Sequence, residues 1–97
     1  MRTFSLTRKA KGDLKSIATY TQERWDKEQR RIYMLQLDTA FHKLANKPEI
    51  GIQCNSIKIG YRKYRVTSHI IFYRNKSPTE IEIVRVLHKR MDAKSKL

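Results

Sequence analysis

Acidic residues are scarce in this chain, and the shortage limits the partners that it can have. There are 22 Lys and Arg against 9 Asp and Glu, so the formal net charge is +13. A small domain with so much self-repulsion is expected to bind an acidic partner: a nucleic acid, an acidic protein or an anionic membrane surface. The stretch between Gly51 and Thr79 contains no acidic residue at all, while its basic side chains are Lys58, Arg62, Lys63, Arg65, Arg74 and Lys76.

The chain also lacks the cysteines that disulfides and most zinc sites require. Cys54 is the only cysteine, which excludes an internal disulfide and a cysteine-based zinc centre. We interpret it as a thiol without a special role. Metal-ligand spacings, glycine-rich phosphate loops and a Ser–His–Asp order are missing as well, so we expect neither a cofactor nor a metal ion.

Long apolar runs are missing too. No segment approaches the roughly 20 apolar residues of a membrane-spanning helix, and residues 1–6 carry no apolar stretch of signal-peptide length. We therefore expect a cytoplasmic protein without a membrane partner. A chain of 97 residues, 39% of them hydrophobic, can bury one small core and not two, so residues 1–97 are expected to form one domain.

Apolar residues recur at helical spacing in the first half of the chain. A short strand with Phe4 and Leu6 on one face comes first, and Thr7 then predicts the N-cap of a helix. The apolar stripe of that helix consists of Ala10, Leu14, Ile17, Ala18, Thr21 and Trp25. Asp26 predicts the N-cap of a second helix, which ends before Pro48. Its stripe consists of Tyr33, Leu37, Ala40, Phe41 and Leu44, widened by Ile32 and Leu35. The very short break between the helices predicts an antiparallel hairpin.

Alternating patterns in the second half predict strands. Residues 57–59 alternate and precede Gly60, which permits a bend or bulge. Residues 61–66, 69–74 and 80–87 follow as further strands, the last with the mostly apolar pattern of a central strand. We expect the helix stripes to pack against Phe72, Ile83 and Val86, and residues 89–97 to bury little. The order β–α–α–β–β–β indicates an α+β domain with an antiparallel helical hairpin on a mainly antiparallel sheet.

Side chains suited to catalysis are present, but no assembled set appears in the sequence. His88 suits general acid–base chemistry, Arg62 and Arg85 suit stabilisation of phosphate charge, and Tyr61 suits orientation of a substrate. His88 is equally suited to a structural hydrogen bond at a strand end. A basic sheet with Tyr61, Tyr64 and Tyr73 can bind phosphates and stack on bases, or it is a solvated face whose tyrosines belong mostly to the core.

Taken in order, several segments resemble the ParE toxins, a family of the ParE/RelE toxin–antitoxin superfamily. Ala10, Asp13-Leu14, Ile17 and Tyr20 resemble the family's opening helix. Residues 25–29 resemble its Trp-Gly-x-x-Gln hinge, with Asp26 in place of the usual glycine. Residues 60–64 and 68–73 are similar to its middle strands, and residues 85–92 to its ending. The resemblance therefore spans nearly the whole chain.

This resemblance implies a fold and a function. The fold is the helical hairpin on a twisted antiparallel sheet that ParE toxins share with RelE toxins. The function is that of the toxin in a type II toxin–antitoxin system, neutralised by a cognate antitoxin with an acidic tail. Its implied target is DNA gyrase, through the A subunit, whose stalled cleavage complexes block replication and arrest growth. Contact with nucleic acid is then only indirect, through gyrase-bound DNA or through the antitoxin.

Two classes of mechanism remain open, beside an inactive member that only binds its antitoxin. The first is a non-enzymatic gyrase inhibitor, for which the candidate docking residues are His88, Lys89, Arg90, Met91, Asp92 and Trp25. The second is a ribosome-dependent mRNA endonuclease of the RelE type, for which the candidate catalytic residues are His88, Arg62, Arg85 and Tyr61. Candidate antitoxin contacts in either case are Arg30, Arg31, Arg62 and Arg65. The ending at residues 88–92 resembles ParE more closely, which favours the gyrase inhibitor.

Overall fold

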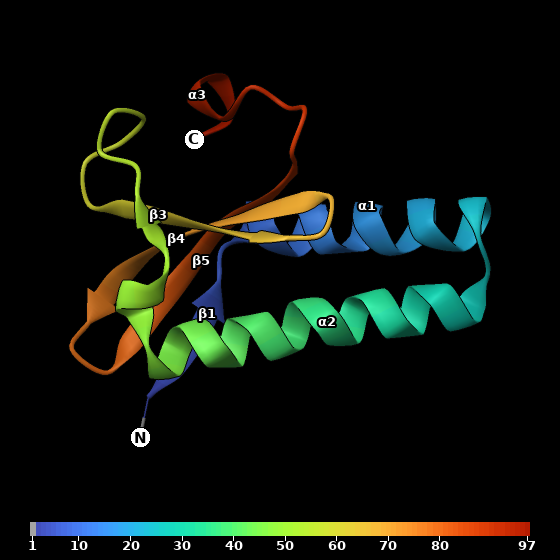
Figure 1. Cartoon of the computed structure of the whole chain (residues 1–97), viewed down its shortest axis with the longest axis horizontal. Helices are drawn as coiled ribbons and strands as arrows, with labels where there is room; N and C mark the ends of the chain where they lie inside the picture. Colours follow the sequence, from blue (N-terminus) through green and yellow to red (C-terminus); the bar gives the residue numbers. More distant parts are fainter. Residues whose placement is uncertain (1) are drawn as a thin grey trace.

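The computed structural model, which describes residues 2–97, has the predicted order of elements with three additions, a 3-10 turn, a short strand and a short C-terminal helix (Figure 1). The elements are β1 (Thr3–Leu6), α1 (Arg8–Arg24), α2 (Lys27–Asn46), a 3-10 turn η1 (Pro48–Ile50), β2 (Ile52–Gln53), β3 (Tyr61–Val66), β4 (His69–Ser77), β5 (Glu80–His88) and α3 (Ala93–Lys96). The strand predicted at residues 57–59 is wrong. The Cys54 carbonyl accepts hydrogen bonds from the amides of Ile57 and Lys58, which closes this segment into turns, and a short strand lies at Ile52–Gln53 instead.

Both helices begin at the predicted caps. The Thr7 hydroxyl accepts a 3.0 Å hydrogen bond from the Ala10 amide, and an Asp26 carboxylate oxygen accepts one of 2.7 Å from the Gln29 amide. Only Trp25 and Asp26 separate α1 from α2. Because so short a connection forces the chain to reverse, the helices lie side by side as an antiparallel hairpin (Figure 1).

The sheet formed by the described residues has the strand order β1-β5-β4-β3-β2. The neighbouring pairs from β5 to β2 are antiparallel, whereas β1 runs parallel to β5, with Phe4 opposite Ile81 and Leu6 opposite Ile83. The predicted mainly antiparallel sheet is confirmed. The parallel pair joins the first strand of the chain to the last.

The helical hairpin covers one face of the sheet. Leu37, Phe41 and Leu44 of α2 are buried in one cluster with Ile71 and Val86 of the sheet. Burial of each such side chain stabilises the fold by about 1.5–3 kcal/mol. Two members of the predicted stripes do not take part, since the side chains of Trp25 and Leu35 are 68% and 52% exposed. For Trp25 the reason is that α1 ends at Arg24, so the helical period no longer applies to it.

A second, smaller cluster lies on the other face of the sheet. Side chains alternate along a strand, so Phe72 points away from the helices that Ile71 and Tyr73 contact, and its predicted packing against the helix stripes is wrong. Phe72 is buried with Cys54 and Leu87. The tail buries little, as predicted, since no residue of 89–97 is fully buried; only Ala93 and Leu97 are half-buried, against this cluster. They are four residues apart, which places both on one side of a helical turn.

Among residues 2–97, no helix is both long and apolar enough to cross a membrane.

Candidate partner-binding site

The first turns of α1 close the edge of β5 that β1 leaves open. β1 pairs with β5 only as far as Ile83. Beyond that point the Thr7 amide donates to the Ile83 carbonyl (3.1 Å), and the Thr7 hydroxyl donates to the Val84 carbonyl (2.7 Å). The Asp13 carboxylate then accepts a 2.9 Å hydrogen bond from the Val86 amide. The start of α1 and the end of β5 are therefore held in one rigid unit.

The Arg85 side chain is hydrogen-bonded within this unit, so it is not available to a substrate. Its Nε and Nη2 donate to the two carboxylate oxygens of Asp13, each at 2.8 Å, and its Nη1 donates to the Lys96 carbonyl at 3.2 Å. The two side chains are only 16% and 14% exposed, and hydrogen bonding to Asp13 raises the pKa of Arg85. The guanidinium thus joins α1, β5 and α3, and its geometry gives no support to the predicted role in stabilising phosphate charge.

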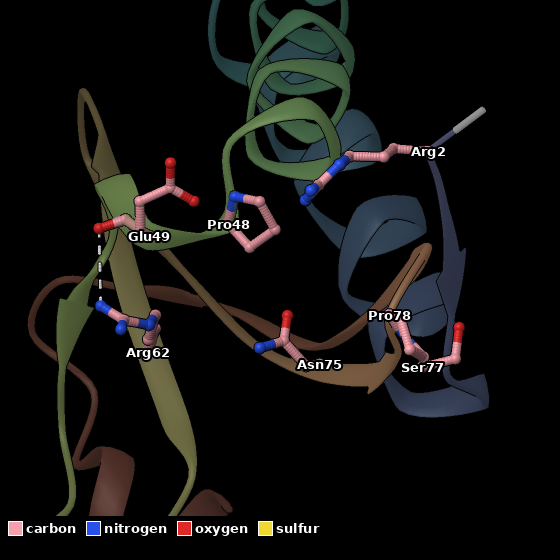
Figure 2. A pocket seen from close by; sticks show the side chains of 7 residues that line it. All are labelled: Arg2, Pro48, Glu49, Arg62, Asn75, Ser77 and Pro78. Atoms are coloured by element: carbon pink, nitrogen blue, oxygen red, sulfur yellow. Dashed lines mark hydrogen bonds between the residues drawn. The ribbon is translucent and has the colours of Figure 1, made fainter.

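Arg62 lies on β3, two strands away from Arg85, and lines a polar pocket of about 280 Å³. Figure 2 shows its guanidinium directed toward the backbone carbonyl of Glu49, with Asn75 and Arg2 also lining the pocket. Its Nη1 donates to the Gly51 carbonyl at 2.7 Å and approaches the Glu49 carbonyl at 3.5 Å. This side chain therefore stabilises the loop that leads into β2.

The four candidate nuclease residues do not converge. Tyr61 contacts the second cluster on the far face of the sheet, whereas its neighbour Arg62 faces the other way. Strand register places His88 opposite His69, and His69 opposite Val66. His88 is therefore four residues along the strands from Arg62, or roughly 13 Å at the usual rise of a strand. Within the described residues these four side chains form no single catalytic constellation.

The tyrosines of the predicted basic sheet belong largely to the core. Tyr73 is buried, donates to the Pro48 carbonyl at 2.6 Å and accepts from the Gly51 amide at 2.9 Å, and burial raises its pKa. Tyr64 packs against the main core, and its hydroxyl accepts a hydrogen bond from Lys43. The buried ring of Tyr73 therefore has no open face for stacking, and the Lys43 ammonium lies over the half-buried ring of Tyr64.

Of the four predicted antitoxin contacts, the structure brings two together. Arg30 and Arg31 line a groove of about 430 Å³ on the exposed side of α2, beside Met34 and Leu35. Arg62 is in the polar pocket described above, and Arg65 donates to the carbonyl of Thr67 at the β3–β4 turn. The combination of apolar and basic side chains expected for an antitoxin groove is thus found on α2. It recurs in a groove of about 520 Å³ where Lys63 and Arg65 lie beside Ile50, Ile52 and Ile70.

A second hollow, of about 360 Å³, lies where the helical hairpin projects past the β3–β4 turn (Figure 1). We call it the hinge hollow. Its larger lining residues come from the end of α1, the hinge, α2, β4 and β5, and are Tyr20, Arg24, Trp25, Tyr33, His69 and His88. The floor includes the turn residues Thr67 and Ser68, and Thr67 has a left-handed backbone with φ 52°. The hollow therefore depends on both the helical hinge and the strand turn.

Two histidine side chains and a tyrosine are ordered at the inner wall of the hinge hollow. The rings of His69 and His88 lie edge to face, 5.4 Å apart, and the Tyr33 hydroxyl is 2.6 Å from Nδ1 of His69. Burial, with a smaller effect of neighbouring His88, lowers the pKa of His69 from 6.5 to about 4. Nδ1 of His88 accepts from the Arg90 amide at 3.2 Å, so a neutral His88 ring carries its proton on Nε2.

The hinge hollow brings together two parts of the predicted docking set that are far apart in the sequence, namely Trp25 and His88. The Lys89 amide donates to the Ser68 carbonyl of the β3–β4 turn. The segment after His88 then turns, because the Met91 amide donates to the His88 carbonyl. Met91 is 51% exposed. The Asp92 carboxylate accepts from the Lys94 amide and caps α3.

Sequence reasoning did not assign Tyr20, Tyr33 or His69 to this site. Tyr20 and Arg24 are four residues apart on α1, which was a detectable sign that they share one side of the helix. The pairing of His69 with His88 depends on the register between β4 and β5, which includes irregularities at Phe72/Tyr73 and Asn75/Ser77. No local pattern in the sequence specifies such a register.

The comparisons with known proteins agree with this architecture. The family model of the ParE toxin of the type II toxin–antitoxin system parDE matches residues 4–93. Toxin ParE1 of Caulobacter vibrioides is 37% identical over 97 residues, which cover 100% of this chain and 99% of that protein. Toxin ParE1 of Mycobacterium tuberculosis is 39% identical over 89 residues, covering 92% and 91%.

Among solved structures, a chain of the chromosomal ParDE TA system from P. aeruginosa superimposes with a TM-score of 0.77. It is 22% identical in sequence, and the match covers 91% of this chain and 96% of that one. The fold is therefore that of the ParE/RelE toxins. The chain belongs to the ParE toxin family of type II toxin–antitoxin systems.

Proposed function

We propose that this toxin arrests growth by binding DNA gyrase, through its A subunit, and stalling the enzyme on cleaved DNA, without chemistry of its own. The observation that carries the proposal is the hinge hollow, where Trp25 and His88 line one surface. An exposed aromatic ring beside a rigid strand end is well suited to anchor a protein interface. The residues next to it, Lys89 and Arg90, are exposed and basic.

The scattered positions of the candidate nuclease residues also support a binding mechanism. A ribosome-dependent nuclease needs acid–base and phosphate-binding side chains within hydrogen-bond reach of one phosphate. Arg85 is bound to Asp13 and Arg62 to backbone carbonyls. His88 is the one member of that set with access to the hinge hollow. We therefore keep the RelE-type activity only as an alternative result of the experiment below.

We propose that a cognate acidic antitoxin neutralises the toxin by lying along the groove on α2. Lys27, Arg30 and Arg31 outweigh Asp38 in its lining, although Arg31 also pairs with Glu28, and Met34 and Leu35 supply apolar contacts. A short acidic segment that orders on binding suits such a surface. Because the groove and the hinge hollow have different lining residues, antitoxin binding and gyrase binding can be weakened separately by mutation. Since gyrase and the antitoxin act in the cytoplasm, we propose that location for the toxin as well.

The proposal is tested by binding of the purified toxin to the gyrase A subunit and, in parallel, to ribosomes. Trp25→Ala is expected to weaken binding to the A subunit while leaving antitoxin affinity unchanged. The matched variant is Arg30→Ala together with Arg31→Ala. It should weaken binding to the antitoxin while leaving affinity for the A subunit unchanged. Tight binding to ribosomes, with no binding to gyrase, would replace the gyrase proposal with the nuclease one.

A further inference from the structure

We propose that the hinge hollow binds an unpaired nucleobase, so that the toxin itself contacts single-stranded nucleic acid. The sequence alone predicted only indirect contact, through gyrase or the antitoxin. The setting of this contact in the cell, DNA opened by gyrase, rests on the proposed function. Binding of a free strand does not, and it can be measured without gyrase.

The aromatic side chains of the hollow are arranged around an open space. Tyr20 and Trp25 are 59% and 68% exposed, although both are large apolar groups that a stable fold would otherwise bury. Tyr33 forms the deeper side and is held by hydrogen bonds to the Val66 carbonyl and to His69. Base rings stack on such side chains whatever their sequence, because every base has a flat π face.

Polar groups suited to the edge of a base lie at the inner wall. His88 presents Nε2 as a hydrogen-bond donor, since its Nδ1 accepts from the Arg90 amide. His69 remains uncharged near neutral pH because burial lowers its pKa, so the wall offers hydrogen-bonding groups without a buried charge. Gln29, whose amide carries both donors and acceptors, completes the polar part of the lining.

The charges around the hollow suit the phosphates of a nucleic acid strand. No acidic residue is among its lining residues. Of the nearest carboxylates along the chain, Asp26 caps α2 and Glu28 pairs with Arg31, whereas Glu23, next to Arg24, is exposed and outside the lining of the hollow. Arg24 lies on the rim, and Lys89 and Arg90 follow His88 directly. Cations around a cluster of aromatic rings provide sites for both the phosphates and the bases of one strand.

The experiment uses the full-length toxin and three labelled probes of equal length in fluorescence anisotropy. The first is a strand of about 12 deoxythymidines, within the usual site sizes for such binding. The second is the same sugar–phosphate backbone without bases, and the third is a duplex whose bases are paired. Trp25 is the only tryptophan in the chain, so its fluorescence reports stacking directly.

We expect the deoxythymidine strand to bind at least about fivefold more tightly than the abasic strand or the duplex, given the usual strength of base stacking. Its binding should quench Trp25, and Trp25→Ala should abolish the preference for bases while Trp25→Phe retains most of it. The control is Lys76→Ala, which removes an exposed charge on β4 distant from the hollow in the register. It should weaken binding of all three probes to a similar extent.

Equal affinity for the three probes, or a base preference that survives Trp25→Ala, would overturn the proposal. So would a Trp25→Ala variant that loses gyrase binding while its affinity for the strand is unchanged, because the hollow would then accept a protein side chain. These outcomes leave the gyrase proposal standing. Conversely, a base preference in a toxin that never binds gyrase would contradict the proposed function and leave the nucleobase site in place.

Discussion

Arg85 donates two hydrogen bonds of 2.8 Å to the carboxylate of Asp13, across the contact between β5 and α1. The two residues are 72 positions apart in the sequence. Each belongs to a segment that resembles the ParE family, Asp13 to the opening helix and Arg85 to the ending. Their pairing gives both segments a structural role, because it holds the first helix, the last strand and α3 together.

Removal of this pair should destabilise the fold. Asp13→Ala deletes the partner of Arg85 and of the Val86 amide and leaves a poorly exposed guanidinium unpaired, so we expect a loss of about 3 kcal/mol in the free energy of unfolding. Urea denaturation provides the measurement. The control is Glu28→Ala, which removes an ion pair whose side chains are 63% and 60% exposed, and it should have no measurable effect. Equal stability of the two variants would contradict the structural role of Asp13.

Replacement of two glycines by alanine should change the stability of the fold in opposite directions. A Cβ at Gly51 would lie 2.0 Å from the Tyr73 hydroxyl, so Gly51→Ala must displace a buried ring and should cost about 1–3 kcal/mol. Gly12 is in α1, and a Cβ added there would meet no atom within 4 Å outside its own helical turn. Gly12→Ala should stabilise the helix by about 0.5–1 kcal/mol. The unfolding temperatures of both variants test these expectations. An unchanged unfolding temperature in Gly51→Ala would show that Tyr73 is not fixed as described.

Acid should destabilise the protein through His69. Its pKa in the fold, about 4, is below the ordinary value of 6.5, so the unfolded chain takes up the proton first. The contribution of His69 to stability is therefore complete above about pH 6.5 and declines as the pH falls toward 4. We expect a loss of about 1–2 kcal/mol, allowing for the partial exposure of the ring.

Denaturation curves across this pH range test that expectation. His69→Gln should flatten the profile, because it removes the titrating group. His42→Gln removes another histidine, which is exposed on α2 beside Asp38, and should leave the profile unchanged. An unaltered acid profile in His69→Gln would show that another group is responsible.

Antitoxin association should depend on salt. The toxin carries a formal net charge of +13, and attraction to an acidic partner is screened over about 10 Å at 0.1 M salt. The association rate should fall as salt rises, and more gently for the Arg30→Ala/Arg31→Ala variant than for the wild type. Stopped-flow mixing measures both slopes. A rate indifferent to salt would contradict the electrostatic part of the antitoxin proposal.

The fold was largely predictable because its determinants are local. Thr7 and Asp26 identify both helix starts by their side-chain chemistry, and the stripe around Leu37 and Phe41 follows the helical period. The errors arose where tertiary contacts decide the outcome. Phe72 was assigned to the wrong face because its burial alone does not say which layer covers it. The partial packing of Leu97 on the second cluster is likewise a contact that the tail's own sequence does not reveal.

The site was predictable only in part, for the same reason. Trp25 and His88 are both predicted from the sequence as docking residues, but their presence in one hollow depends on how the hinge projects past the sheet. Arg62 and Arg85 looked available for phosphate binding because they are basic residues on strands. The structure shows Arg62 bound to the Gly51 carbonyl and Arg85 to Asp13, and composition cannot distinguish a free arginine from one that is already engaged.

The side chains of Arg90 and Met91 should be needed for the toxic activity and not for the fold. Arg90 and Met91 are exposed beside the hinge hollow, so the Arg90→Ala/Met91→Ala variant should retain its unfolding temperature and its antitoxin affinity. Growth arrest by the expressed toxin should be lost, as an interface loses its anchoring contacts. Full toxicity of a folded double variant would show that the docking surface lies elsewhere on the toxin.

The central claim, that the toxin poisons gyrase without chemistry of its own, is tested most directly by a DNA cleavage assay. Purified toxin is incubated with gyrase and supercoiled plasmid, and linear DNA is scored after denaturation, with translating ribosomes and mRNA tested beside it. We predict that linear DNA accumulates with the wild-type toxin, that Trp25→Ala greatly reduces it, and that the mRNA stays intact. Uncleaved plasmid together with mRNA cut on the ribosome, and loss of that cut in His88→Ala, would contradict the claim.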